Sequence, residues 1–73
     1  MPHISIKMYP GRDEATKKRL AQAILETASK ELERGTEHFS VSIEDVPQEN
    51  WKEAVYDKVV SDKNTVIQPG YTM

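Results

Sequence analysis

The first residues of the chain alternate between polar and apolar side chains. Ile4, Ile6 and Met8 are apolar, and the residues between them are polar. A period of two is typical of a strand with one buried face, so residues 2–8 are predicted to form a strand. Tyrosine, proline and glycine at 9–11 end it, because proline cannot donate to a ladder and glycine permits a turn.

The pattern then changes to helical spacing, which continues over residues 13–34. Apolar side chains form one stripe there: Leu20, Ala21, Ile24, Leu25, Ala28 and Leu32. Such a stripe predicts a single amphipathic helix. Asp13 is its expected N-cap, Glu14 suits the positive helix start, and Gly35 is the expected stop signal after its last turn.

A second alternation and a second helical pattern complete the chain. Phe39, Val41 and Ile43 alternate with polar residues, so residues 39–44 are predicted to form a strand. A second helix is expected to begin near Pro47, because apolar residues follow at helical spacing: Trp51, Ala54, Val55 and Val59. The tail, residues 64–73, contains a short β-prone stretch at 65–67 and is expected to form a short strand or an extended arm.

Strand, long helix and strand in this order define an α/β fold built on one βαβ unit with parallel strands. The 73 residues form a single domain, 1–73. Two parallel strands need cover and neighbours, and one helix shields one face only. With so thin a core and no cysteine for disulfides, the chain is expected to form a homo-oligomer.

Charge and composition narrow the classes of partner. The net charge is −2, so no overall field favours nucleic acid or an anionic membrane. No apolar run is long enough to span a bilayer, and the first residues lack the apolar core of a signal peptide. A cytoplasmic protein is therefore expected. The two histidines, His3 and His38, have no metal-ligand spacing, and no metal site is predicted.

The residue type with unusual chemistry is the proline at position 2. The chain has no nucleophilic cysteine, no metalloprotease motif and no phosphate-binding glycine loop. Removal of Met1 would expose the secondary amine of Pro2, and burial or a nearby cation such as Arg12 or Lys7 would lower its pKa toward neutrality. Taken alone, Pro2 is more simply explained as the end of a strand.

Four segments together carry a family resemblance over nearly the whole chain. They are MPHISIKMYPGR at the start, the helix DEATKKRLAQAILETASKEL, the segment SVSIEDVPQENW and the ending PGYTM. In this order and spacing the sequence resembles the 4-oxalocrotonate tautomerase family, within the MIF-like superfamily, and is most similar to its phenylpyruvate tautomerase branch. The resemblance implies a small β-α-β tautomerase protomer.

The resemblance also implies roles for individual residues. Pro2 matches the family's catalytic amino-terminal proline, Arg12 the arginine that binds the substrate carboxylate, and Trp51 the aromatic residue that lines the pocket. Without the resemblance, Arg12 reads as a solvated loop arginine and Trp51 as a core residue on a helix. Ser40 stands where founding members carry a second arginine, which favours a monocarboxylate over a dicarboxylate. Tyr71 is a candidate to reach a neighbouring subunit's site.

The expected function is a keto–enol tautomerase that needs no cofactor. Its substrate would be a 2-oxo or 2-hydroxyenoic monocarboxylate such as phenylpyruvate, with Pro2 as general acid and base. Two alternatives stay open: an acrylic-acid hydratase or dehalogenase on the same fold, and a non-catalytic oligomeric scaffold. A homodimer with one four-stranded sheet is favoured over a hexamer.

Overall fold

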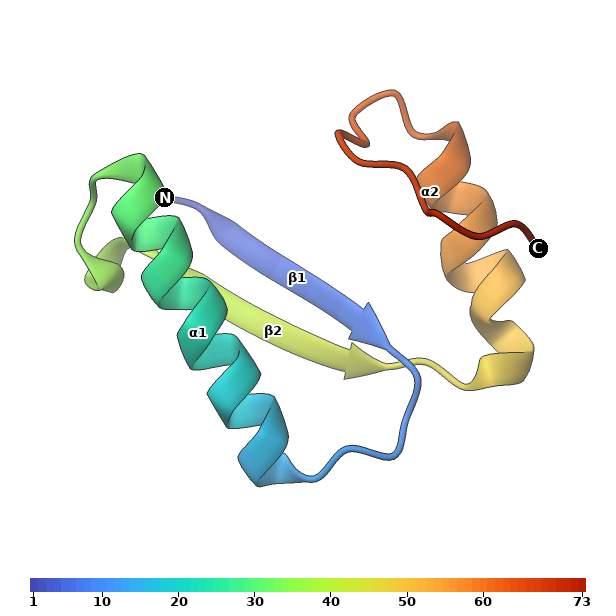
Figure 1. Ribbon diagram of the computed structural model, residues 1–73, viewed down its shortest axis with the longest axis horizontal. Helices are drawn as coiled ribbons and strands as arrows, with labels where there is room; N and C mark the ends of the chain where they lie inside the picture. Colours follow the sequence, from blue (N-terminus) through green and yellow to red (C-terminus); the bar gives the residue numbers. More distant parts are fainter.

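Two parallel strands and the helix between them make up the first half of the chain. The computed structural model describes residues 1–73 and contains β1 (His3–Met8), α1 (Glu14–Leu32) and β2 (Ser40–Asp45) (Figure 1). β1 and β2 pair in parallel, in a register that runs from His3 opposite Ser40 to Met8 opposite Asp45. The predicted βαβ unit is confirmed, with each strand within about one residue of its expected range.

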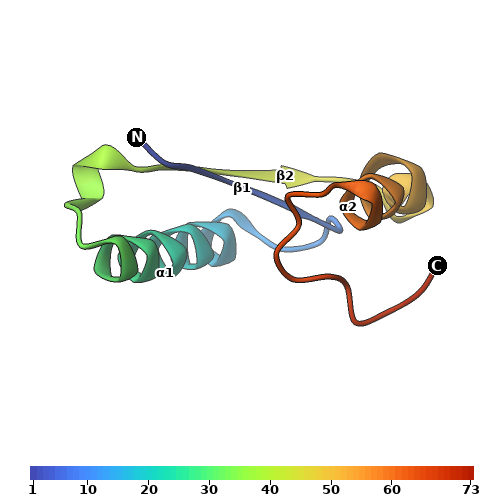
Figure 2. The same ribbon diagram turned by 90° about the horizontal axis from the view of Figure 1, so that it is seen from above.

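α1 covers one face of the sheet (Figure 2). The strands alternate between apolar and polar residues, so one face of the sheet is apolar and the other is polar. The alternate residues of both strands that face α1 are half-buried: Ile4, Ile6, Met8, Val41 and Ile43. On the other face, His3 contacts the hydroxyls of Ser40 (2.6 Å) and Ser42 (3.1 Å), and Lys7 pairs with Glu44 at 3.5 Å. These cross-strand pairs satisfy the polar side chains and leave this face exposed.

The start of α1 agrees with the prediction and its end does not. The Asp13 carboxylate accepts the Thr16 backbone N–H at 2.8 Å, as expected of an N-cap. The helix ends at Leu32, two residues before the expected end, and its C-cap Glu33 takes the left-handed conformation (φ 53°). The prediction of Gly35 as the stop was therefore wrong. The Glu33 and Arg34 N–H groups still bond Lys30 and Ser29 carbonyls, which satisfies the last turn.

The second helix begins near Pro47 as predicted but consists of three short pieces. A 3₁₀ turn, η2 (Gln48–Asn50), leads into the π-helical turn η3 (Lys52–Tyr56), and α2 (Asp57–Ser61) follows. The tail forms an arm. No strand forms at residues 65–67, because Val66 and Ile67 find no partner strand and stay exposed.

The protomer leaves its core incomplete. Val46 and Val55 are its buried residues. Its accessible surface is 5767 Å², whereas a folded monomer of 8.3 kDa exposes about 4,600 Å². The radius of gyration, 13.8 Å, likewise exceeds the roughly 11 Å of a compact chain of this length. None of the helices has the length and apolar content required to cross a bilayer.

Candidate active site

A pocket of about 410 Å³ opens where β1 ends. Its lining comes from three parts of the chain: the end of β1 and the loop after it, the turn into η3, and the C-terminal arm. The lining residues are Lys7, Met8, Tyr9, Arg12, Trp51 and Tyr71. Its walls are mostly apolar, and its polar groups include two cationic side chains. This combination suits an organic anion with an apolar tail.

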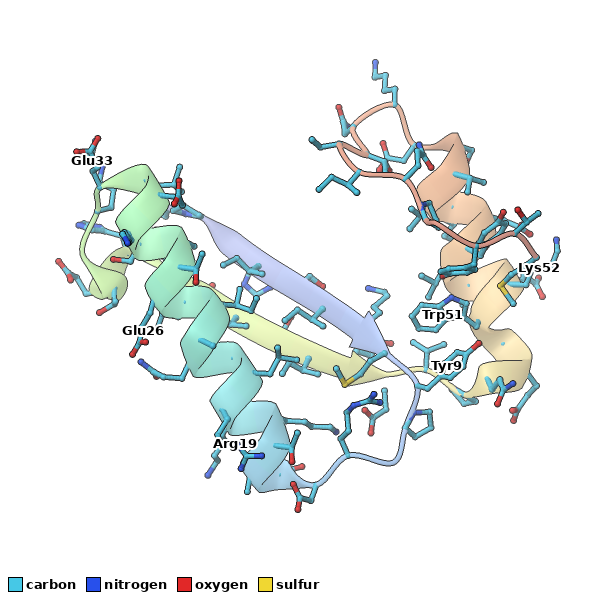
Figure 3. All side chains as sticks on the ribbon, viewed as in Figure 1. Tyr9, Arg19, Glu26, Glu33, Trp51 and Lys52 are labelled. Carbon is cyan, nitrogen blue, oxygen red and sulfur yellow. The ribbon has the colours of Figure 1, made fainter.

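Three aromatic side chains form the pocket's apolar wall. The rings of Tyr9 and Trp51 meet edge to face, with centroids 5.0 Å apart and an interplanar angle of 89° (Figure 3). The Trp51 indole N–H donates to the Tyr71 hydroxyl at 3.0 Å. The Tyr71 ring also lies against Tyr56, with ring centroids 5.5 Å apart. Edge-to-face and tilted contacts of this kind hold rings in fixed orientations.

Arg12 supplies a positive charge that no carboxylate of the protomer neutralises. It follows Gly11, whose φ of 123° is a conformation that side chains rarely adopt, so the loop turns there. Its neighbour Asp13 is committed to capping α1, and the hydrogen bond from Thr16 lowers the pKa of the Asp13 carboxyl. Arg12 has no ion pair or side-chain hydrogen bond. Its guanidinium is therefore available to bind a carboxylate in a bidentate manner.

The other cations near this end of the sheet already have partners. Lys17 of α1 bonds the Asp45 carboxylate at 2.9 Å, and this hydrogen bond raises the pKa of Lys17. The pair ties α1 to the end of β2. Lys7 pairs with Glu44 on the polar face. Of the two cations that line the pocket, Lys7 has a carboxylate partner within the protomer and Arg12 has none.

Pro2 and Ser40 lie at the opposite end of the sheet. The Ser40 N–H donates to the Pro2 carbonyl at 3.3 Å, and β1 separates both residues from the Arg12 pocket by roughly 20 Å. Pro2 lines a smaller hollow of about 230 Å³ with Met1, Arg34 and His38. Within one protomer, the structure brings Arg12 and Trp51 together and places Pro2 and Ser40 elsewhere.

The sequence did not predict three residues near these sites, and it predicted a fourth, Tyr71, only as a candidate to reach a neighbouring subunit's site. Tyr9 was interpreted only as part of a strand-ending turn, although its place directly after β1 puts it beside any site at that edge. Tyr71 lies twenty positions from Trp51, and no local pattern predicts that contact. Arg34 and His38 reach the Pro2 hollow because α1 ends early and the η1 turn (Thr36–His38) follows it.

The chain contains no group of three or more histidine, aspartate or glutamate side chains placed to hold a metal ion. The Arg12 pocket is lined by no carboxylate at all. Its residues can bind an anion and bury an apolar group. Lys7, Tyr9 and Tyr71 are its titratable groups besides Arg12, and no histidine is among its lining residues.

Comparison with known proteins identifies the class to which this fold and pocket belong. The model of the tautomerase enzyme family matches residues 2–63. The chain therefore belongs to the tautomerase family, and its βαβ unit is the fold of that family. The protein is an isomerase that interconverts keto and enol forms, which confirms the resemblance seen in the sequence.

Three relatives are similar to this chain over most or all of their length. It is 35% identical to Tautomerase PptA of Enterobacter sp. (strain 638) over the full length of both chains. It is 32% identical to Tautomerase PptA of Cronobacter sakazakii, again over both full lengths. A probable tautomerase of Xylella fastidiosa is 34% identical, over 97% of this chain and 89% of the relative.

Proposed function

We propose that the protein interconverts the enol and keto forms of a 2-oxo monocarboxylate such as phenylpyruvate, without a cofactor, once Met1 has been removed. The observation that carries this proposal is the pocket in which the unpaired Arg12 guanidinium faces the aromatic wall of Tyr9, Trp51 and Tyr71. Such a pocket offers one charged partner and one apolar partner, which are the two ends of an aryl 2-oxo acid.

The reaction needs one group that both accepts and donates a proton. In the proposed mechanism, the neutral secondary amine of Pro2 takes the proton from the 2-hydroxyl of the enol. The resulting ammonium then delivers a proton to carbon 3, which leaves the 2-oxo acid and the neutral amine. Arg12 holds the carboxylate and stabilises negative charge that develops on the oxygen. Atoms and charge balance without a co-reactant.

Because Pro2 and Arg12 lie at opposite ends of β1, this mechanism requires two subunits. The Pro2 and Met8 carbonyls both bond β2, so the odd residues between them direct their N–H and C=O groups to the free edge of β1. A second β1 that pairs antiparallel along that edge, centred on Ser5, would bring Pro2 of one copy opposite Met8 of the other. Each Pro2 would then lie beside the partner's Arg12 pocket.

Two features of the protomer support such a homodimer. The C-terminal helical segment lies beside β1 (Figure 1). A groove of about 490 Å³ is lined by Ser5 and Lys7 of β1 and by Trp51, Ala54, Val55, Lys58 and Val59 of that segment. The surface in excess of a compact monomer is about 1,200 Å² per protomer, which exceeds the roughly 800 Å² that a standard interface buries on each partner. The dimer would contain one four-stranded sheet with both α1 helices on the same face.

The proposal is tested by following ketonisation of phenylenolpyruvate with protein whose mass shows that Met1 is absent. Turnover well above the uncatalysed rate is expected, and Pro2→Ala should retain only part of it, because its amine is primary and less rigidly held. The same samples are assayed for hydration of an acrylic acid. Hydration of the acrylic acid without ketonisation would favour the hydratase reaction instead. If Pro2→Ala keeps the full wild-type rate in both assays, the proposed role of Pro2 is contradicted.

A further inference from the structure

The C-terminal arm reaches the pocket through one side chain, Tyr71. The start of the arm is held at Thr65, whose hydroxyl donates to the Val59 carbonyl at 2.8 Å, and the side chains of Val66 and Ile67 that follow are 94% and 85% exposed. Only Tyr71 combines a hydrogen bond to the pocket wall, from the Trp51 indole N–H, with a ring contact to Tyr56. These two contacts hold the Tyr71 ring at the pocket.

We propose that Tyr71 is a specificity-determining residue. Its ring forms one wall of the Arg12 pocket and gives the site its preference for carboxylates that carry an aromatic ring. The proposal rests on the proposed function, because it takes Arg12 as the partner of the carboxylate. It adds that the arm, a segment outside the βαβ unit, decides which apolar tail the pocket accepts.

The lining of the pocket supports this assignment. Tyr9 and Trp51 meet at nearly a right angle and form two sides of a box, and Tyr71 lies beside Trp51 on another side. An aromatic ligand ring in this pocket would have three aromatic neighbours to stack against, whereas a short aliphatic tail has no ring to make such contacts. Contacts between aromatic rings stabilise beyond the area that they bury.

The hydrogen bond from Trp51 explains why position 71 should be tyrosine and not simply an apolar residue. It gives the indole N–H an acceptor, so this donor of the wall is not left unsatisfied beside an apolar ligand. It also holds the Tyr71 ring against Trp51, although half of the Tyr71 surface is exposed. Phenylalanine at this position would keep the ring and lose the bond that fixes it.

The experiment measures binding of two unreactive carboxylates, 3-phenylpropanoate and butanoate, to the full chain. Trp51 is the only tryptophan, so its fluorescence reports the pocket directly. The wild-type protein is compared with Tyr71→Ala, Tyr71→Phe and the control Thr72→Val, which changes a neighbouring arm residue that lines no pocket.

The expected result is a selective loss. Tyr71→Ala should raise the Kd for 3-phenylpropanoate about tenfold and that for butanoate less than twofold, and Tyr71→Phe should raise the first about threefold. Thr72→Val should match the wild type. Equal losses for both ligands, no loss, or no preference for 3-phenylpropanoate in the wild type would each overturn the proposal. If Tyr71→Ala does not fold, Tyr71→Phe gives the same decision.

This result is independent of turnover. A protein that binds 3-phenylpropanoate selectively through Tyr71 but does not ketonise phenylenolpyruvate would contradict the proposed function and support the assignment of Tyr71. Catalysis of ketonisation with no Tyr71-dependent selectivity would do the reverse.

Discussion

Ser5→Pro should dissociate the proposed homodimer without unfolding either subunit. Ser5 lies at the centre of β1, its N–H faces the free edge of the strand, and its side chain makes no hydrogen bond within the protomer. Proline removes only that N–H and keeps an extended backbone, so the ladder between β1 and β2 remains. In a dimer paired about Ser5, both copies lose their donor at the interface.

The size of the effect follows from two lost hydrogen bonds. Each contributes about 0.5–1.5 kcal/mol net, and the two carbonyls left without a donor raise the total to roughly 2–3 kcal/mol. This corresponds to an increase in the dimer Kd of about 30- to 150-fold. Ser5→Ala is the matched control, because it removes the hydroxyl and keeps the N–H.

Sedimentation velocity over a dilution series measures this Kd. Ser5→Pro should dissociate at concentrations where the wild type and Ser5→Ala stay dimeric, and its tautomerase activity should return as the concentration rises, since Pro2 and Arg12 would come from different subunits. If Ser5→Pro assembles like Ser5→Ala, the free edge of β1 is not the interface and the two-subunit site is refuted. If the wild type is a hexamer and Ser5→Pro dissociates it across the same edge, the proposed interface stands and only the proposed number of subunits changes.

Three further predictions concern single residues. Arg12→Ala should lower kcat/KM for phenylenolpyruvate by an amount equivalent to about 2–4 kcal/mol. Arg12→Lys should recover only part of kcat/KM, because an ammonium cannot form the bidentate contact. Unchanged kinetics in both variants would mean that Arg12 is a solvated side chain. Val55→Ala removes two methyl groups from a buried position and should lower the free energy of unfolding in urea by about 2 kcal/mol at fixed protein concentration, whereas a change near zero would mean that Val55 is not in the core. Asp13→Ala should lower the Tm above pH 5, and the difference in Tm from the wild type should shrink as the pH falls below about 4. The hydrogen bond from Thr16 lowers the pKa of Asp13 in the folded protein. The charged cap therefore stabilises the fold above the pKa of Asp13 in the unfolded chain, and this stabilisation is lost as the pH falls through its pKa in the folded protein. A pH-independent difference would contradict that role of the carboxylate.

The elements that the sequence predicted well are those set by local patterns. Alternation in β1 and β2 and the apolar stripe of α1 depend on neighbours within a few residues, and all three formed where expected. The stop of α1 was wrong by two residues, because the C-cap Glu33 adopts the left-handed conformation. At residues 65–67, β propensity alone could not make a strand without a neighbour to pair with.

The candidate site, too, could be predicted from the sequence only in part. The joint position of Arg12 and Trp51 followed from the family resemblance, since nothing local links a loop to a helix forty residues later. Arg12 was predicted from the sequence as a candidate cation near Pro2. Within one protomer the six-residue strand β1 keeps the two apart, because a residue before such a strand cannot meet one after it. The contact between Trp51 and Tyr71 depends on how the arm folds back, and only the three-dimensional structure reveals it.

The central claim is that the free amine of Pro2 moves the proton, and comparing two forms of the same chain tests it most directly. When Met1 is attached, the Pro2 nitrogen is part of an amide, has no N–H and cannot accept a proton near neutral pH. Both forms, verified by intact mass, should have the same far-UV circular dichroism and the same oligomeric state. The processed form should ketonise phenylenolpyruvate, and the form that retains Met1 should be nearly inactive. Equal turnover by the two would remove Pro2 from the mechanism.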